Sequence, residues 1–509
     1  MPRHPLRLCV SAALLFVAAC ASPVRTTELA RIDERSGYRY TALDQRAPKS
    51  IDKSAVIMTF SGGGTRAAAL ADGALRALAA TEVPSMVGRV PLASQIDVVS
   101  SVSGGSVTAA YFALTGIDGL SDFEQNFLYS NVMDALITRA LANPRQLFYP
   151  RIDILADYLD EEVFTHKTYG DLLAAGSPGR NRRPYVILNA ADMASGSVFS
   201  FTQDQFDLIC SDLADLRLAD AVSASAAFPV ALSALTIRNR APCNPQRLAP
   251  ETAGTGWKLK DGWPEPTRII NDRAVDTELG INYPASANLA RFRRGTVSLT
   301  YLNRDKKKDF IQLLDGGIAD NLGLTMPLTL LTSPSESPSF LNWVNTGRVD
   351  KLLFVVVNAR PQVNNDFGSQ PRPPGLTDTL LAATGTPIDA TSFQLLGQLD
   401  RLIDDRFNPK SLVLIDFDLI ADAGCRAYFH SMATSWALPH QQVEDLIAMG
   451  EAMVLQSPRY RQFVASLHAT APMPPRSVEQ ICAPTTPRSR RRPRVTTKGR
   501  RDSSLCSGS

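Results

Sequence analysis

The sequence predicts an α/β protein with a mostly parallel central sheet and a large insertion. Two stretches carry this prediction, because residues 54–80 and 96–114 each pass from a short apolar run through small residues into an Ala-rich run. Short β-branched runs favour buried strands, and the small residues after them allow a tight turn into a helix. The apolar runs at 352–357 and 412–415 are expected to add central strands.

The second of these stretches has the form of a nucleophile elbow. Ile96–Val99 predicts a strand, Ser100–Ser106 a turn of small residues, and Val107–Leu114 a helix. An elbow exposes a serine hydroxyl on a strained turn at the start of a helix. The backbone N–H groups at that helix start favour developing negative charge.

The serine at the centre of this turn is Ser103. The usual elbow pattern Gly-x-Ser-x-Gly places a small residue on each side of the nucleophile. Here Ser101 replaces the first glycine, and Gly104 and Gly105 follow the central serine. Ser103 is therefore the candidate nucleophile, and an ordinary structural turn is the alternative interpretation.

The first stretch contains three consecutive glycines. Gly62, Gly63 and Gly64 leave backbone N–H groups bare of side chains, and Thr65 and Arg66 open the predicted helix. Such a turn can cradle a phosphate or form an oxyanion hole. Neither glycine-rich nucleotide-binding pattern is present, so the nearby serine elbow favours the oxyanion hole.

A third stretch supplies a candidate general base. A predicted strand ends at Asp315, and Gly316 and Gly317 follow it. A carboxylate at a strand end, beside glycines that let another loop approach, can accept a proton from a nucleophile. Asp320 and Asn321 are expected to orient this loop. A lone Asp-Gly-Gly also occurs as a plain turn.

Together these stretches resemble the patatin-like phospholipase family, from about Ala55 to Leu324. The resemblance rests on four blocks in the family's order: Gly62–Arg66, Ser101–Gly105, the Ala-Ser-x-Ala-x-Pro segment Ala224–Pro229, and Asp315–Gly317. It implies a three-layer α/β/α fold with a Ser–Asp dyad and an oxyanion hole at the glycine turn. Ser103 would be the nucleophile and Asp315 the base, with no metal or other cofactor.

Histidines leave a second arrangement open. His430 and His440 follow Asp315, which is the chain order of a Ser-His-Asp hydrolase with an elbow, although the glycine blocks favour the dyad. We expect a serine acyl-ester hydrolase acting on phospholipids or other lipid esters, of phospholipase A or lysophospholipase type. The alternatives are a serine-dependent acyltransferase and a catalytically silent envelope lipoprotein.

The N-terminus predicts export. Arg3 and Arg7 precede an apolar run, Leu8–Ala19, which is too short to span a bilayer. The run ends in a sequence that resembles a bacterial lipobox, so residues 1–19 would be a lipoprotein signal peptide and Cys20 would carry the lipid. A plain secretory signal is the alternative. Ala21 is not the aspartate associated with inner-membrane retention, so we expect a lipid-anchored protein at the outer membrane.

The remaining organisation follows from composition. We expect a polar tether at 20–53, a hydrolase domain at 54–470 with an irregular insertion at 236–294, and a disordered basic tail at 471–509. Residues 485–509 hold eight basic residues and one acidic residue, and the signal peptide holds two more arginines. Without them the net charge falls from +3 to about −6, so the body is not expected to bind nucleic acid.

Cysteine use also fits export. Four cysteines of the body can form two disulfides in an oxidising compartment, and we expect the pairs Cys210–Cys243 and Cys425–Cys482, with Cys506 unpaired. No Cys-x-x-Cys occurs and histidine is scarce, so no metal site is expected.

Further helices and strands are expected from the apolar patterns. The helices are at 121–173, 218–227, 376–402 and 443–467, and the strands are at 184–190 and 198–202. Residues 296–303 and 309–314 are expected to form a hairpin across a solvated lysine turn.

Overall fold

The computed structural model describes most of the chain between Pro23 and Ala483. The described residues are 23–30, 36–39, 51, 53–86, 88–142, 151–176, 182–229, 232–243, 258–260, 263–265, 275–278, 281–284, 289–303, 306–332, 349–361, 388, 390–403 and 411–483. The predicted signal peptide, Cys20, Cys506 and the most basic part of the tail lie outside them.

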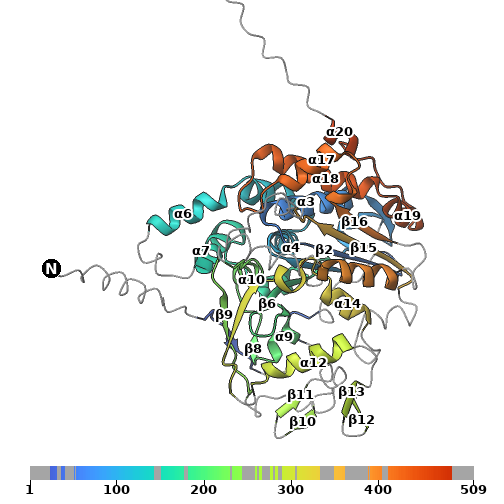
Figure 1. Cartoon of the computed structure of the whole chain (residues 1–509). Helices are drawn as coiled ribbons and strands as arrows, with labels where there is room; N and C mark the ends of the chain where they lie inside the picture. Colours follow the sequence, from blue (N-terminus) through green and yellow to red (C-terminus); the bar gives the residue numbers. More distant parts are fainter. Residues whose placement is uncertain are drawn as a thin grey trace, which may run out of the picture.

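An eight-stranded sheet lies at the centre of the molecule (Figure 1). Its order is β16-β15-β2-β5-β6-β14-β9, and β7 pairs with β6. Strands β16, β15, β2, β5 and β6 run parallel to one another, whereas β14, β9 and β7 pair antiparallel. The bounds are β2 Ser54–Phe60, β5 Val98–Val102, β6 Tyr185–Asp192, β7 Ser197–Ser200, β9 Leu235–Arg238, β14 Phe310–Asp315, β15 Lys351–Asn358 and β16 Leu412–Asp416.

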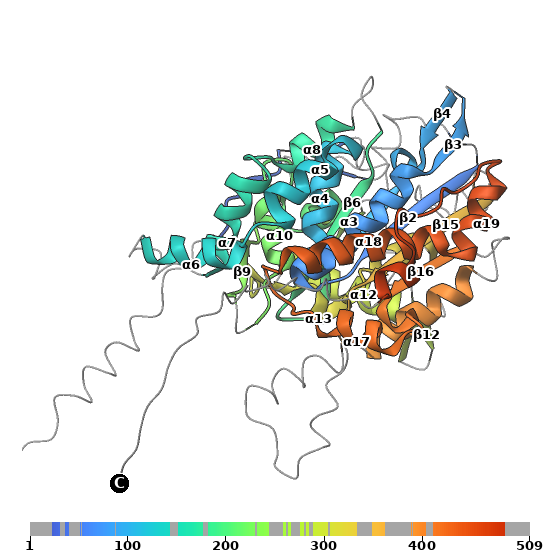
Figure 2. The same cartoon turned by 90° about the horizontal axis from the view of Figure 1, so that it is seen from above.

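Helices flank this sheet on both faces, so the predicted α/β fold with a mostly parallel sheet is confirmed. Figures 1 and 2 show α3, α4 and α18 along one face, whereas α12 and α14 lie below the sheet in Figure 1. The helix bounds are α3 Gly64–Ala80, α4 Gly104–Thr115, α5 Leu120–Phe123, α6 Val132–Ala142, α7 Arg151–Tyr158, α8 Tyr169–Ala175, α9 Gln203–Asp207, α10 Leu218–Ser225, α12 Leu289–Tyr301, α13 Gly317–Asp320, α14 Thr325–Thr332, α17 Ala423–Ser431, α18 His440–Gln456, α19 Pro458–Ser466 and α20 Val478–Cys482.

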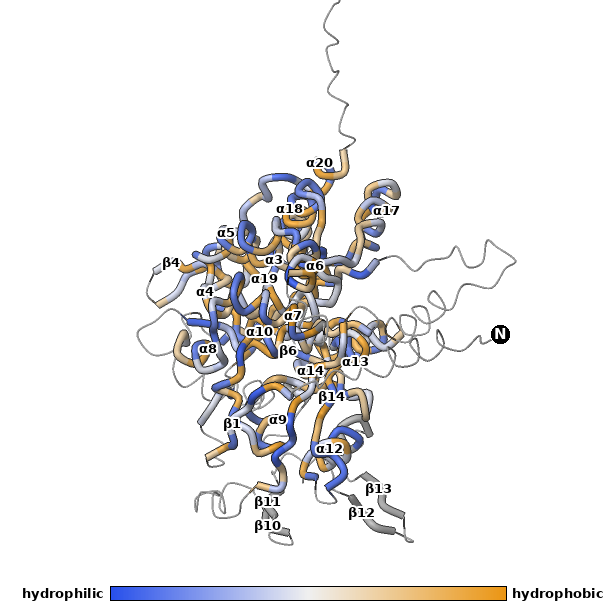
Figure 3. The backbone as a smooth tube through the Cα atoms, turned by 90° about the vertical axis from the view of Figure 1, so that its left-hand side faces the viewer, coloured by the Kyte–Doolittle hydropathy of each residue, from blue (hydrophilic) through white to orange (hydrophobic). Residues whose placement is uncertain are grey.

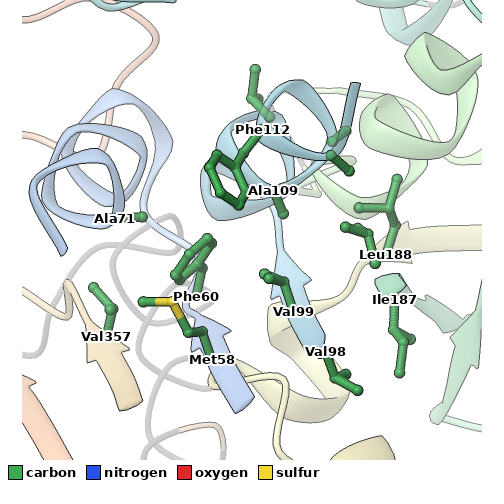
Figure 4. Packing of buried hydrophobic residues seen from close by; sticks show 14 of the residues in the cluster. Met58, Phe60, Ala71, Val98, Val99, Ala109, Phe112, Ile187, Leu188 and Val357 are labelled. Atoms are coloured by element: carbon green, nitrogen blue, oxygen red, sulfur yellow. The ribbon is translucent and has the colours of Figure 1, made fainter. Parts of the chain in front are cut away.

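The core lies between the parallel strands and the helices that follow them. Every residue of β2 and β5 is buried, as expected for strands covered on both faces. Figure 4 shows Phe60 and Val99 on the strands beneath Ala71 of α3 and Ala109 of α4. The small alanines let both helices approach the sheet closely, which fixes the positions of their first turns.

The strand leading to the elbow begins and ends later than predicted. It covers Val98–Val102, so Ser100 and Ser101 are part of the sheet and not of the turn. Both serines pair with neighbours in β2 and β6. Their hydroxyls are satisfied inside the protein, because Ser100 accepts from Asn189 and Ser101 accepts from Ser106. Polar residues are tolerated in a buried strand when they are bonded in this way.

The predicted hairpin before Asp315 is wrong in its first half. Its first strand, residues 296–303, lies mostly in α12, whereas its second strand is β14 and delivers Asp315 as predicted. The alternation of apolar and polar residues in Val297–Tyr301 suggested a strand, but the preceding turns continue as a helix. The lysine turn is not fully solvated either, since Lys308 Nζ lies 2.6 Å from the buried carboxylate of Asp192.

Three further features differ from the predictions. The helix expected at 443–467 is two helices, because Pro458 starts α19 and disfavours a helical residue before it. Strand β16 lies at the edge of the sheet and not at its centre. The insertion predicted at 236–294 overlaps β9, and it also holds the hairpins β10 Lys258–Lys260 with β11 Trp263–Glu265 and β12 Val275–Glu278 with β13 Ile281–Pro284.

The described part of the predicted tether packs against the domain. Strand β1 (Thr27–Glu28) pairs with β8 (Ser211–Asp212), Tyr38 is buried, and the buried Arg39 forms an ion pair with Asp207. These contacts remove apolar and charged groups from solvent, which a free tether would not do. The segment is therefore part of the folded domain wherever the structure describes it.

Both predicted disulfides are confirmed. Cys210 bonds to Cys243, and Cys425 bonds to Cys482. The second bond ties α20 to α17, so the predicted start of a disordered tail at residue 471 is too early. Residues 484–509 lie outside the described part of the chain.

Candidate active site

Ser103 lies at the turn between β5 and α4. Its backbone has φ 51° and ψ −125°, a conformation that non-glycine residues rarely adopt and that is typical of a nucleophile elbow. The side chain is 7% exposed. The departure at Ser101 is accommodated, because that residue is fully buried and its hydroxyl accepts a hydrogen bond from Ser106 at 3.1 Å.

Asp315 lies at the end of β14 and faces Ser103. Burial raises the pKa of its carboxyl to about 6, while hydrogen bonds from the Gly317 N–H and the Ser103 side chain act in the opposite direction. The Gly317 N–H donates to Oδ1 at 2.8 Å. A buried carboxylate whose pKa is near neutrality and responds to a serine hydroxyl has the properties of a general base.

The glycine turn touches the elbow. The Gly62 N–H donates to the Asn321 carbonyl at 3.2 Å, and the Thr65 N–H donates to the Ser435 carbonyl at 2.9 Å. Between them, the N–H groups of Gly63 and Gly64 have no partner among the described residues. Two free N–H groups at the start of a helix are the donors that an oxyanion hole requires.

Thr65 and Arg66 hold this turn in place and do not line it. Arg66 is fully buried, and its guanidinium donates to the Ala359 carbonyl at 2.8 Å, to the Met432 carbonyl and to the Thr434 hydroxyl. Burial lowers the pKa of this guanidinium to about 10. These bonds join the first turn of α3 to the end of β15 and to the loop that contains Ser435.

The loop after Asp315 braces the same site. The Gly316 N–H donates to the Ser225 carbonyl at 3.0 Å. Asp320 is buried and accepts from the Thr325 N–H at 2.6 Å, which fixes the start of α14. Asn321 accepts the Gly62 N–H described above, so this loop and the glycine turn meet directly. All the predicted positions of the elbow, the turn and the loop thus come together.

Ser225 was missed as a functional residue by the sequence analysis. Its hydroxyl accepts the N–H of Ser103 at 2.9 Å and donates to the Asn189 carbonyl at 2.6 Å. It also lies 2.9 Å from the Ser106 hydroxyl. Because its carbonyl accepts the Gly316 N–H, one buried serine connects the turn of Ser103 with the loop that carries Asp315. The sequence placed Ser225 in a predicted helix at 218–227 and in the family block Ala224–Pro229, without a role in catalysis.

Asn189 and Ser435 were also missed. Asn189 interrupts the apolar run of β6, and its amide donates to Ser100 and to the Ser101 carbonyl. A polar residue in an otherwise apolar strand was the signal that could have found it. Ser435 had no such signal, since it joins the site through its backbone from a loop more than a hundred residues after Asp315.

The histidines bond elsewhere. His430 Nε2 lies 2.9 Å from Asp418 Oδ1, and its Nδ1 has no hydrogen-bond partner among the described residues. His440 stacks on Tyr129, with ring centroids 3.7 Å apart. Neither is a hydrogen-bond partner of Asp315, so the geometry does not form the triad that chain order left open.

The described residues lack two other features. No group of three or more His, Cys, Asp or Glu side chains is arranged to hold a metal ion. No described helix combines the length and the apolar character that a membrane span needs.

Comparison with known proteins agrees with this site. A family model described as patatin-like phospholipase matches residues 58–328, which is more than half of the chain and includes Ser103, Ser225 and Asp315. No curated protein matches the chain. The chain therefore belongs to the patatin-like phospholipase family, whose members are lipid acyl hydrolases.

Proposed function

We propose that the protein is a phospholipase A or lysophospholipase that hydrolyses lipid esters with a Ser103–Asp315 dyad. The observation that carries the proposal is that Ser225 joins the turn of Ser103 to the loop of Asp315, beside the Gly63 and Gly64 N–H groups that have no partner among the described residues. Nothing in this arrangement requires a third catalytic side chain. The family match supports the class of substrate.

The reaction follows from these positions. Asp315 accepts the hydroxyl proton of Ser103 as Oγ attacks the ester carbonyl, and the oxyanion accepts hydrogen bonds from the Gly63 and Gly64 N–H groups. The tetrahedral intermediate expels the alcohol, which takes the proton from Asp315. Water then attacks the acyl-serine, with Asp315 as base, and releases the fatty acid and Ser103.

Activity is expected to rise with pH across the range around pH 6. Asp315 must be ionised to accept a proton, and its pKa is raised to about 6 by burial. The measurement is kcat/KM for a soluble ester between pH 4.5 and 8. An acid limb with its midpoint near pH 4 would mean that the base is a carboxyl with an ordinary pKa, and not Asp315.

Ser225→Ala is expected to lower kcat by about ten- to a hundredfold with a small effect on KM. Without the hydroxyl, the Ser103 N–H loses its acceptor and the elbow loses its bond to β6. Activity and thermal stability should be measured together, with Ser225→Thr as the conservative variant that keeps a hydroxyl. A normal kcat in Ser225→Ala would show that this contact does not position the nucleophile.

We further propose that the protein is an exported bacterial lipoprotein anchored through Cys20. The lipobox-like sequence and the two disulfides support export to an oxidising compartment. Expression in a bacterium fed with a clickable fatty acid tests the anchor. Labelling should occur in the wild-type chain and be lost in Cys20→Ser, and equal labelling of both would refute the anchor.

The activity test is the release of fatty acid from phosphatidylcholine and lysophosphatidylcholine. Wild type should release fatty acid and Ser103→Ala should not. Ser431→Ala is the control and should also release fatty acid, because the Ser431 hydroxyl is exposed and bonds only to its own helix.

Adding long-chain alcohols tests the acyltransferase alternative, since transfer would give new esters in place of free acid. No turnover of any ester by wild type would support the catalytically silent lipoprotein instead.

A further inference from the structure

Helix α6 carries an exposed apolar stripe. Met133 is 39% exposed, Ile137 51% and Leu141 70%, and their spacing of four residues places them on one face. No other helix in the described part of the chain carries more than one large apolar side chain that is exposed in this way. Single exposed apolar residues are ordinary, but three on one helix face mark an interaction surface.

The opposite side of α6 is fixed to the protein. Val132 is buried, and Arg139 forms ion pairs with Glu161 and Glu162 at 2.7 and 2.9 Å. The same guanidinium lies over the ring of Tyr158, 5.2 Å from its centroid. These contacts hold the apolar stripe outward, and α6 lies at the edge of the folded body in Figure 1, on the side that faces the viewer in Figure 3.

The segments on both sides of α6 contact elements that brace the active site. Before it, the π-helix η3 (Glu124–Leu128) places Phe127 against Trp436, with ring centroids 6.3 Å apart, beside the residue that accepts the Thr65 N–H. After it, α7 is joined to α10 by the ion pair of Asp157 with Arg217 at 3.1 Å. Helix α10 ends at Ser225, so α6 lies between two elements that contact the supports of the glycine turn and of the Ser103 turn.

The start of the described chain lies on the same side as α6. The Val24 N–H donates to the Thr236 carbonyl at 2.8 Å, and Val24 bridges to Ile237 of β9. At the start of α7, the Ile152 N–H donates to the Ser233 hydroxyl, just before β9. Cys20 precedes Val24 by four residues, which span at most about 14 Å. A lipid anchor at Cys20 would therefore hold this edge of the molecule against a lipid surface.

The charges around the stripe indicate how it would bind. Arg139, the one basic residue of α6, is already paired with two glutamates, and Asp134 is exposed near the N-terminus of the helix. The helix thus has no free cation to attract anionic headgroups. Its attraction to a membrane would come from burying apolar side chains, which is insensitive to salt.

We propose that Met133, Ile137 and Leu141 of α6 insert into the lipid layer from which the active site takes its substrate. The inference rests on the proposed function. It adds a surface that lies outside the catalytic residues and that takes a zwitterionic lipid surface as its partner. In this arrangement the anchor brings the protein to the membrane, and α6 holds this edge of the molecule against it.

The test compares two substrates for two matched variants. Ile137→Glu/Leu141→Glu should lower hydrolysis of phosphatidylcholine vesicles by about tenfold or more in 0.5 M salt and leave hydrolysis of a soluble short-chain ester unchanged. Met86→Glu is the control, because Met86 is 83% exposed on the β3–β4 hairpin (Glu82–Ser85 and Gly88–Pro91), far from α6 in Figure 2. Unchanged vesicle hydrolysis, or equal losses on both substrates, would overturn the proposal.

Hydrogen exchange of the unmodified full chain supplies a second readout. Residues 132–142 should exchange more slowly when phosphatidylcholine vesicles are added, at a protein concentration where the chain is monomeric. Protection that appears at high protein concentration without vesicles would assign the stripe to contact between copies and overturn the proposal. The proposed catalytic function is tested separately. If wild type hydrolyses the soluble ester and Ser103→Ala does not, that function stands even where the vesicle and exchange tests fail.

Discussion

Asp315→Asn is expected to lower ester hydrolysis by about 10²- to 10⁴-fold and to make the fold more stable at neutral pH. The amide cannot accept the Ser103 proton, so the loss should appear in kcat. Its Oδ1 can still accept the Gly317 N–H, so the loop geometry is retained. Loss of activity together with a gain of stability separates a catalytic role from a structural one.

The direction of the stability change follows from the pKa of Asp315. Burial raises this pKa from 3.8 to about 6, so the folded state resists ionisation more than the unfolded state does. The native state therefore loses stability as the pH rises from 3.8 to about 6, and the full penalty of about 3 kcal/mol applies above that range. The asparagine variant carries no such penalty.

Urea unfolding at pH 5 and pH 8 measures this difference. The advantage of Asp315→Asn over wild type should be about 3 kcal/mol at pH 8 and about half of that at pH 5. A variant that is less stable than wild type at both pH values would show that the carboxylate is a structural anchor. A fully active variant would remove Asp315 from the mechanism.

Gly104→Ala is expected to lower activity by about a hundredfold or more through one added methyl group. A Cβ at Gly104 would lie 2.0 Å from the Gly64 carbonyl oxygen and 2.6 Å from its carbonyl carbon. Backbone atoms cannot give way as a flexible side chain can, so the elbow and the glycine turn must move apart. The oxyanion donors would then no longer face the carbonyl that Ser103 attacks.

The matched control is Gly397→Ala. Gly397 is also in a helix, within residues 390–403, and a Cβ there meets no atom within 4 Å. This variant should keep full activity. Both variants should be compared by kcat/KM and by circular dichroism. An active, folded Gly104→Ala would show that the contact between elbow and turn is dispensable. If the variant is unfolded, labelling of Ser103 by a serine-reactive probe during refolding would locate the defect.

Much of this site could be predicted because each predicted residue is determined locally. Ser103 stands on a strand-to-helix turn, and Asp315 ends a strand, so their neighbours in sequence are enough to identify them. The strand before the glycine turn and the helix after it also depend on local apolar patterns.

The missed features depend on contacts between distant segments. Ser225 gains its role only because α10 packs against the elbow, and Ser435 reaches the glycine turn by its backbone alone. The short alternation at Val297–Tyr301 fits a strand as well as the end of a helix, and only tertiary packing decides between them. The apparent tether contained Tyr38, whose burial against Tyr169 and Tyr185 no local pattern indicates.

The most direct test of the account is where a fluorophosphonate probe bonds to the purified protein. The probe reacts with a serine that is activated by a base and faces an oxyanion hole. Peptide mass spectrometry should find the adduct on Ser103 in wild type, and labelling should disappear in Ser103→Ala and fall strongly in Asp315→Asn. An adduct on another serine, or unchanged labelling of Ser103→Ala, would contradict the assignment of the nucleophile.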